Sequence, residues 1–270
     1  MNFITGDKFK GIADYTFSSK DKIVDDYDSL VNTLNMTTVK RNAVVYTHTG
    51  YVKELFALLK EYPSKYVHVV SHNSDINVDE SFELPQNVVK WYTQNVNVEH
   101  PRIISIPIGL ENDRWFKRLA KKQVMMQLLQ QPKQIKNLVY LNHNIATNIK
   151  ERLNVYQLFE NKNFVTSQRG RNGAHFNDYI TNVYNHRFVL CPQGNGMDTH
   201  RTWETMYMGT IPIEKRNKNN AFYKDFPICF VDEWDEITEN FLLCEYERIK
   251  AMLFDRNKLE FKYWNNLIRG

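Results

Sequence analysis

Cysteine is scarce in this chain of 270 residues: there are three, and they form no C-x-x-C pair. The histidines form no H-E-x-x-H segment either, so the usual zinc-binding spacings are missing. Cys191 and Cys229 lie in apolar, strand-like runs and Cys244 in a helix-like one, as reduced core thiols do. We therefore expect no metal site, no cofactor and no disulfide framework.

Long hydrophobic runs are also missing. The longest apolar segments have the length of strands, and the first residues, MNFITGDKFKG, contain no hydrophobic signal segment. We therefore expect no membrane segment and a cytoplasmic protein. The chain also lacks a strong excess of one sign of charge, because its net charge of +4 is small and dispersed. It suits an anionic substrate but does not by itself indicate nucleic acid.

Two common nucleotide fingerprints are absent. The chain has neither G-x-G-x-x-G nor a Walker lysine, which disfavours enzymes that use NAD or ATP. Asp26-Tyr27-Asp28 is formally a D-x-D triplet, the manganese signature of other glycosyltransferases. No strong strand precedes it, and we interpret it as the start of a helix.

The chain alternates between short β-rich runs and intervals of helix length, which predicts an α/β protein with parallel, doubly wound sheets. Hydrophobic content of 42% is enough for one large or two modest domains. The predicted strands are 43–47, 66–71, 88–92, 103–107, 138–141, 164–167, 187–191, 210–213 and 228–231. The predicted helices include 51–61, 112–130, 239–254 and 257–268, with a polar joint after Pro132.

The most informative segment is 187–214, RFVLCPQGNGMDTHRTWETMYMGTIPIE, which reads as a strand, a glycine-containing loop, a short helix ended by Gly209 and a second strand. Arg201 and Glu204 share one face of the helix. A helix start with an arginine favours an anion such as a diphosphate, and a carboxylate one turn later can accept two ribose hydroxyls. The alternative interpretation, an Arg/Glu pair on a solvated helix surface without a ligand, has about the same weight.

Within this segment, CPQGNGMDTHRTWETMYMGTIPI resembles the carboxy-terminal motif of exostosin-like glycosyltransferases: a C-P-x-G loop, an R-x-x-E helix and a G-x-x-P-I strand. The resemblance implies a GT-B fold, with two Rossmann-like doubly wound domains and an interdomain cleft. It places Arg201 on the diphosphate and Glu204 on the ribose of a sugar nucleotide. Gln193 stands where the family often has a basic residue, so further phosphate contacts must come from elsewhere.

The activity implied by the resemblance is inverting transfer of a sugar from a nucleotide-diphosphate sugar to a hydroxyl of a glycan or glycoprotein, without a required metal. A UDP-sugar is the expected donor, with UDP-xylose as a guess. Cellular exostosins are anchored in Golgi membranes. A compact cytosolic form suits a microbial enzyme or one from a large DNA virus, of the chlorovirus type, acting in the host cytoplasm.

Doubly wound domains bind ligands at the carboxyl ends of their strands, so the loops there supply the candidate donor-binding residues. Besides Arg201 and Glu204, these are Gly194, Asn195, Gly196, Asp198, Thr199, His200, Asn142, Thr147, Asn148 and Arg152. For 142–152, a capped helix with a surface arginine is an equally weighted interpretation. Arg169 and Arg171 could close over a phosphate, but we favour a surface turn there.

The first half of the chain is expected to bind the acceptor and to supply the general base that inversion requires. Asp75, in the loop after strand 66–71, is the first choice, although an Asx turn explains it about as well. His72 and His48 are the alternatives, each at a strand end.

The expected organisation is an acceptor-binding Rossmann-like domain at 1–131, a sugar-nucleotide-binding Rossmann-like domain at 132–250, and a carboxy-terminal helix at 251–270 that crosses back to the first domain. Two other functions stay open at this point: a non-catalytic protein that binds sugar nucleotides or glycans, and a nucleic-acid-binding module.

Overall fold

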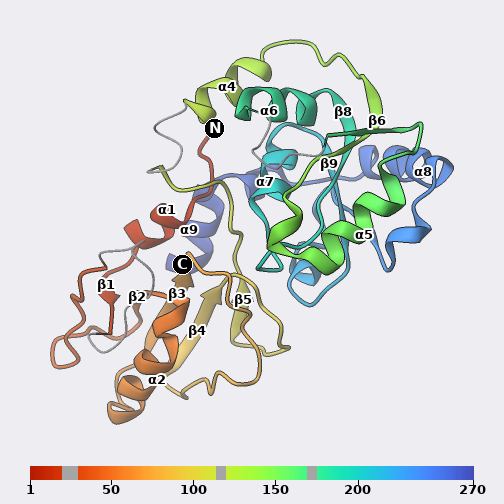
Figure 1. The fold of residues 1–270 in the computed structure, drawn as a ribbon. Coiled ribbons are helices and arrows are strands. Elements are labelled where there is room, and N and C mark those ends of the chain that lie inside the picture. The colour runs from red at the N-terminus through yellow and green to blue at the C-terminus, as the bar shows by residue number, and fades with distance from the viewer. Residues whose placement is uncertain (20–29, 114–119, 169–174) are drawn as a thin grey trace. The chain divides into compact units, whose positions relative to one another are not determined.

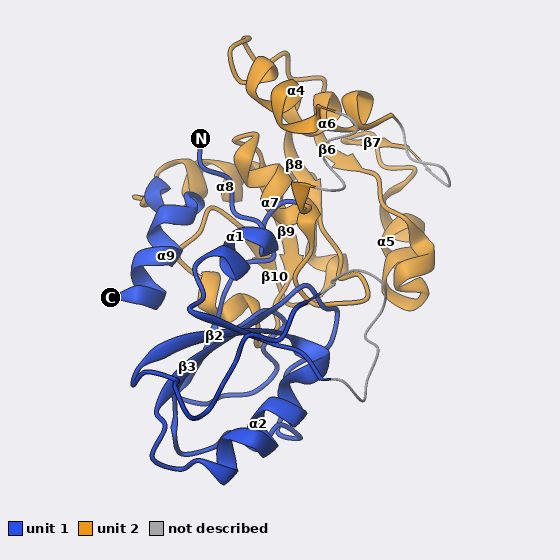
Figure 2. Cartoon of the chain, turned by 90° about the vertical axis from the view of Figure 1, so that its left-hand side faces the viewer, with its two compact units in different colours: residues 1–110, 256–270 blue, residues 111–255 orange. Residues whose placement is uncertain are grey.

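The computed structural model describes residues 1–19, 30–113, 120–168 and 175–270 (Figure 1). Two compact units make up the chain: the first combines Met1–Leu110 with Arg256–Gly270, and the second is Glu111–Asp255 (Figure 2). Each unit contains a five-stranded sheet whose strand pairs are all parallel. The predicted α/β class is confirmed to this extent. Asp26-Tyr27-Asp28, Arg169 and Arg171 lie outside the described residues.

The second unit begins at Glu111, whereas the sequence predicts a joint near Pro132. The difference arises because α4 (Lys121–Leu128) packs against α6 (Phe176–Tyr184), with the Lys121 ammonium 5.0 Å from the centre of the Phe176 ring. Such a contact joins segments far apart in the sequence. It therefore attaches α4 to the second unit and moves the boundary toward the amino terminus.

The first unit contains α1 (Gly6–Gly11), β1 (Tyr15–Phe17), β2 (Ala43–His48), η1 (Thr49–Tyr51), α2 (Val52–Glu61), β3 (Val67–His72), β4 (Val88–Thr93), β5 (Ile103–Ser105), η6 (Arg256–Leu259) and α9 (Phe261–Arg269). Its strand order is β1-β2-β3-β4-β5, the order of the chain. The doubly wound arrangement expected for both sheets is therefore wrong for this one. A doubly wound sheet needs a reversal of strand order, and each strand here is added on the same side of its predecessor.

Helices cover both faces of the first sheet. Trp91 of β4 contacts Phe56 of α2, with ring centres 5.1 Å apart, and belongs to a core cluster that α2 shares with β2 and β3. The next residue, Tyr92, points to the other face because side chains alternate along a strand. Its hydroxyl donates to the Leu267 carbonyl of α9 at 3.2 Å. The carboxy-terminal helix is thus an integral layer of the first unit.

Helix α1 lies close against the carboxyl end of β3. A Cβ atom placed on Gly6 would stand 1.9 Å from Asn73 Oδ1 and 2.6 Å from His72 Nδ1. One turn later, the Phe9 ring lies 5.2 Å from the His72 ring. Glycine at position 6 therefore permits the close approach that buries this strand end.

The second unit contains α4, β6 (Asn137–Leu141), η3 (Ile145–Thr147), α5 (Ile149–Phe159), β7 (Val165–Ser167), α6, β8 (His186–Leu190), α7 (His200–Tyr207), β9 (Ile211–Lys215), η4 (Asn220–Tyr223), β10 (Cys229–Val231), η5 (Trp234–Glu236) and α8 (Glu239–Lys250). Its strand order is β10-β9-β8-β6-β7. The order reverses at β6, so this sheet is doubly wound. Its topological switch point lies between β6 and β8.

The two faces of the second sheet are covered by different helices. Val139 and Leu141 of β6 belong to a core cluster that includes residues of α5 and α8. Tyr140, between them, points to the opposite face and contacts Tyr179 of α6, with ring centres 6.3 Å apart. Helix α7 packs beside α6 and against β9. Helix α7, which begins after the glycine-containing loop, is therefore packed against both a neighbouring helix and a strand of the sheet.

Among the helices of the described ranges, none combines the length and the apolar character needed to cross a bilayer.

We expect Gly6→Ala to lower the free energy of unfolding by about 2 kcal/mol, because its methyl group would collide with Asn73 and His72. Gly11→Ala is the matched control, since a Cβ at the other end of α1 meets nothing within 4 Å. Its effect should stay within about 1 kcal/mol. Urea denaturation of both variants tests this, and equal losses would contradict the close packing at Gly6.

Candidate anion-binding site of the second unit

Arg152 of α5 joins the two loops that flank the switch point. Its Nη1 donates to the Asn144 carbonyl at 2.9 Å and to the Thr147 hydroxyl, in the loop after β6. Its Nε donates to the Gln193 carbonyl at 2.8 Å and its Nη2 to the Pro192 carbonyl at 3.3 Å, in the loop after β8. The guanidinium is therefore engaged by the protein itself and fixes the loops in which the other candidates lie.

The glycine of the second loop fits closely against this clamp. A Cβ on Gly194 would stand 3.0 Å from Arg152 Nη2. The Gly194 N–H donates to the Gly196 carbonyl at 3.1 Å, which makes a tight turn. Asn148 caps α5 by accepting from the Glu151 N–H at 3.3 Å, and its Nδ2 lies 3.4 Å from the Gly194 carbonyl. The predicted residues at 147–148 and 194–196 thus meet at one edge of the sheet.

Other predicted donor-binding residues have structural contacts. Asp198 is buried and accepts from Trp203 Nε1 at 2.8 Å, so its carboxylate faces the core. Thr199 is the N-cap of α7 by backbone conformation but makes no side-chain cap bond. His200 Nε2 lies 3.4 Å from Glu111 Oε1. Asp198 and His200 therefore each contact a side chain of the second unit itself.

Asn142 and Asn195 differ in their surroundings. Asn142 is buried and donates to the Tyr140 hydroxyl at 2.9 Å, which in turn donates to Gln168 Oε1 at 2.7 Å. Asn195 is exposed at the tip of the glycine-containing loop. Asn142 therefore belongs to a hydrogen-bonded network of the second unit.

Arg201, in the first turn of α7, carries the unusual feature of this region. Within the described part of the chain, its Nε and Nη1 atoms are buried and have no hydrogen-bond partner. The guanidinium carbon lies 5.0 Å from the centre of the Tyr179 ring, which covers one face of the group. Buried polar groups almost always have partners, and a charged group without one is strongly disfavoured. An anion would satisfy both free N–H groups.

The charge of Arg201 is maintained by its neighbours. Burial acts to lower the pKa of Arg201, but the surrounding groups, among them the Glu204 carboxylate, outweigh burial and raise that pKa overall. Burial, together with the nearby positive charge of Arg201, lowers the pKa of Arg152 to about 10. The positive charges of these two guanidinium groups therefore act on one another.

Glu204, one turn after Arg201, is buried and accepts a hydrogen bond from the Tyr179 hydroxyl at 2.8 Å on Oε2. Burial raises the pKa of Glu204, partly offset by Tyr179 and Arg201. No ion pair joins Arg201 to Glu204 among the described contacts, although they are three residues apart on one helix. Tyr179 contacts both of them, and its remote position on α6 explains why the sequence did not indicate it.

His143 is a further residue of the site that sequence reasoning missed. It is buried, its Nε2 donates to the Arg152 carbonyl at 3.0 Å, and its Nδ1 has no partner among the described residues. Burial, opposed by that hydrogen bond and aided by Arg201 and Arg152, lowers the pKa of His143 to about 3. It is therefore a neutral imidazole with a free acceptor nitrogen. The sequence signal that could have indicated His143 is its position between Asn142 and Asn144, in the loop that follows a strand.

Glu214 connects the start of α7 to the loop after β9. It accepts from the Thr202 hydroxyl, and from Asn220 Nδ2 at 3.2 Å. Asn217 and Asn220 bond reciprocally through backbone N–H groups and side-chain oxygens, at 2.9 and 2.8 Å. Burial is the main reason that the pKa of Glu214 is raised to about 7.

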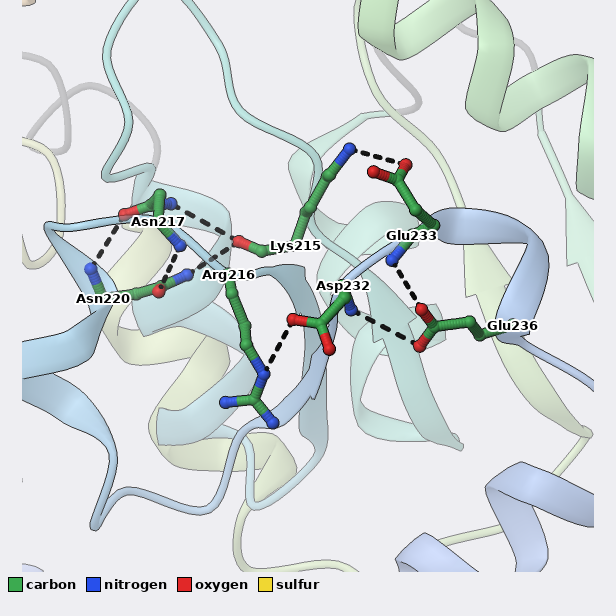
Figure 3. A network of polar contacts seen from close by, with 7 residues as sticks. All are labelled: Lys215, Arg216, Asn217, Asn220, Asp232, Glu233 and Glu236. Atoms are coloured by element: carbon green, nitrogen blue, oxygen red, sulfur yellow. Dashed lines mark hydrogen bonds and ion pairs between the residues drawn. The ribbon is translucent and has the colours of Figure 1, made fainter.

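Ion pairs continue this network at the carboxyl ends of β9 and β10 (Figure 3). Lys215 Nζ lies 2.6 Å from Glu233 Oε2, and Arg216 Nε lies 3.2 Å from Asp232 Oδ1. Glu236 closes a capping box by accepting from the Glu233 N–H at 3.0 Å. These largely exposed pairs link the carboxyl end of β9 to the loop after β10.

In the first unit, both ring nitrogens of each candidate histidine lie within hydrogen-bond distance of another group. His72 is buried, with Nε2 3.1 Å from the Pro107 carbonyl and Nδ1 3.0 Å from Asn73 Oδ1. His48 accepts from the Gly50 N–H at 3.0 Å through Nδ1, and its Nε2 lies 2.7 Å from the Asn73 carbonyl. Both rings therefore stabilise strand ends.

Asp75 has a different environment from the two histidines. It is exposed, in the loop that follows β3. The preceding Ser74 carbonyl accepts from Gln94 Nε2 at 2.7 Å and from Asn95 Nδ2 at 3.0 Å, so the start of this loop is tied to the end of β4. Of the three candidate bases, Asp75 is the one whose side chain faces solvent.

Within the described ranges, no three His, Cys, Asp or Glu side chains are grouped in a way that could hold a metal ion.

No protein-family model matches the sequence, and no curated protein matches it.

We expect Glu214 to contribute a fall in the free energy of unfolding as the pH rises from 5 to 8, because it must lose a proton in a buried site. Its pKa is raised from an ordinary 4.5 to about 7, so the stability present below the lower value is lost as the pH rises through the upper one. Glu214→Gln should remove about 3 kcal/mol of that fall. Urea denaturation across this range tests it.

Glu247→Gln, an exposed carboxylate on α8, is the control and should leave the pH dependence unchanged. A Glu214→Gln protein whose unfolding free energy depends on pH in the same way as that of the wild type would exclude an effect of Glu214 titration on stability.

Proposed function

We propose that this protein is a glycosyltransferase that moves a sugar from a nucleotide-diphosphate sugar, with UDP as the favoured nucleotide, to a hydroxyl group of a glycan or glycoprotein. One observation carries the proposal. Arg201 holds two buried N–H groups that have no partner among the described residues, at the switch point of a doubly wound sheet, where such sheets bind ligands. Arginine forms short, directional hydrogen bonds with phosphate oxygens, so a diphosphate fits this need.

Glu204 supplies the second part of the donor site. Its Oε2 accepts from Tyr179, which leaves Oε1 as an acceptor for a ribose hydroxyl. Arg201 and Glu204 lie one turn apart on α7, so they can contact adjacent parts of the same nucleotide. The R-x-x-E motif on a helix that follows a C-P-x-G loop supports the same roles.

In the proposed GT-B enzyme, the second unit binds the donor and the first unit binds the acceptor. We assign the general base to Asp75, because it is an exposed carboxylate in the loop at the carboxyl end of β3, whereas His72 is buried. We also place the reaction in the cytoplasm. In this scheme guanidinium charge and the start of α7 neutralise the diphosphate, and no metal is invoked.

The proposed reaction inverts the anomeric carbon. Asp75 accepts the proton of the acceptor hydroxyl, and the resulting oxygen nucleophile forms a bond to the anomeric carbon. The bond from that carbon to the diphosphate oxygen breaks, and its electron pair leaves with the diphosphate. Arg201 stabilises the negative charge that develops there, which lowers the barrier to bond cleavage.

We expect one or more donors in a panel of UDP- and GDP-sugars to raise the melting temperature. At about 100 times the dissociation constant, the rise should be about 5 to 10 °C. Arg201→Lys keeps the charge but loses the two-pronged geometry, and Glu204→Gln loses the carboxylate, so both should reduce this shift strongly. Differential scanning fluorimetry measures it.

Two controls match these variants. Arg187→Lys changes an arginine that also lies over an aromatic ring, 4.7 Å from the centre of Tyr246, and Glu247→Gln changes an exposed carboxylate of the same unit. Both should retain the full shift. No response of the wild type to any donor would overturn the proposed function, and salt-sensitive oligonucleotide binding in its place would favour a nucleic-acid-binding module.

Asp75→Asn should reduce transfer about 100-fold or more while leaving the donor-induced thermal shift unchanged, since the base acts on the acceptor. The measurement is product formation from a labelled donor on a glycan array. Glu61→Gln, an exposed carboxylate at the end of α2, is the control. Transfer that survives Asp75→Asn would exclude this residue as the base, and donor binding by the wild type without transfer would favour a non-catalytic sugar-nucleotide-binding protein.

A further inference from the structure

Arg201 and Glu204 have the spacing of a helical ion pair, yet they are not paired among the described contacts. Tyr179 of α6 lies against both. The centre of its ring is 5.0 Å from the Arg201 guanidinium carbon, and its hydroxyl donates to Glu204 Oε2 at 2.8 Å. One side chain from a neighbouring helix thus engages the two charged groups separately.

Keeping Arg201 and Glu204 apart costs free energy, which other contacts must offset. Two opposite charges in a buried setting attract each other more strongly than in water, and a direct pair would satisfy the free N–H groups of Arg201. Tyr179 provides each charge with another partner: the ring face attracts the cation, and the hydroxyl binds the carboxylate. The Nε and Nη1 groups of Arg201 are thereby left available.

We propose that Tyr179 is the positioning residue that keeps Arg201 and Glu204 apart, so that the arginine stays open to a diphosphate. This inference rests on the proposed function for the identity of the ligand. Without the hydroxyl, Glu204 turns toward Arg201 and occupies the N–H groups that the anion needs. A diphosphate then has to displace an internal carboxylate before it binds, which lowers its apparent affinity.

Tyr179 is itself held in place. Its ring contacts Tyr140 of β6 at 6.3 Å and Phe176 of α6 at 6.1 Å, measured between ring centres. Burial, with the nearby charge of Glu204 and despite that of Arg201, raises the pKa of the Tyr179 hydroxyl well above its ordinary value. The hydroxyl therefore keeps the proton that it donates to Glu204.

The test is Tyr179→Phe, which keeps the aromatic ring over Arg201 but removes the hydroxyl. Inorganic pyrophosphate is the probe, because it reports on the arginine without a sugar or a base. Isothermal titration calorimetry should show about a tenfold weaker affinity than in the wild type, as expected when a hydrogen bond to a charged group is lost.

The decisive measurement is whether Glu204→Gln abolishes the effect of Tyr179→Phe on pyrophosphate binding. In Glu204→Gln protein the side chain at this position can no longer form an ion pair with Arg201, so adding Tyr179→Phe should weaken pyrophosphate binding no further. A merely structural role of Tyr179 predicts the same loss in both backgrounds. Because all four proteins in this cycle are compared by the same binding constant, a general loss of stability in the Tyr179→Phe variants does not imitate the rescue.

Tyr184→Phe is the matched control. Tyr184 is on the same helix, its hydroxyl donates to the Gln131 carbonyl, and the Lys133 ammonium lies 5.0 Å from its ring centre, so it combines the same two interactions away from the site. Its loss should not change pyrophosphate affinity. Wild-type affinity in Tyr179→Phe, or an undiminished loss in the Glu204→Gln background, overturns the inference alone. Failure of the wild type to bind pyrophosphate overturns it together with the proposed function.

Discussion

The guanidinium group of Arg152 is the interaction on which the rest of the second unit's site depends. It bonds to carbonyl groups of both loops that leave the sheet at its switch point. Loops without regular structure are usually the most variable part of an α/β unit in conformation. Here a buried, charged donor group with several fixed acceptors holds two of them together, and the glycine at position 194 gives it room.

The strands were predictable for a physical reason. Parallel strands buried on both faces are apolar along their length, and β2, β3, β4, β6, β8, β9 and β10 each overlap a run of that kind. The short β1 lacked a clear signal, with a half-buried polar residue in the middle of three. Strand order was not readable, because it depends on which side each strand joins the sheet.

The sequence indicated which residues of the second unit lie at the site more readily than it indicated their roles. Strand ends meet at one edge, so naming the loops after β6 and β8 was enough to gather Thr147, Asn148 and Gly194 near Arg152. The use of Arg152 by backbone carbonyls depends on loop conformation, which the sequence does not state. In the first unit, burial of His72 depends on Phe9 and Gly6, residues on a helix far earlier in the chain.

The division of the chain also determines when each unit can be completed during synthesis. The second unit is one continuous segment, whereas the first needs Arg256–Gly270 to complete a face of its sheet. Arg269 forms two hydrogen bonds with Asp14, and Phe261 packs on Phe9. A chain emerging from the ribosome can therefore finish its second unit while the first still exposes the apolar surface that α9 covers. The segment made first can thus be completed only by the segment made last.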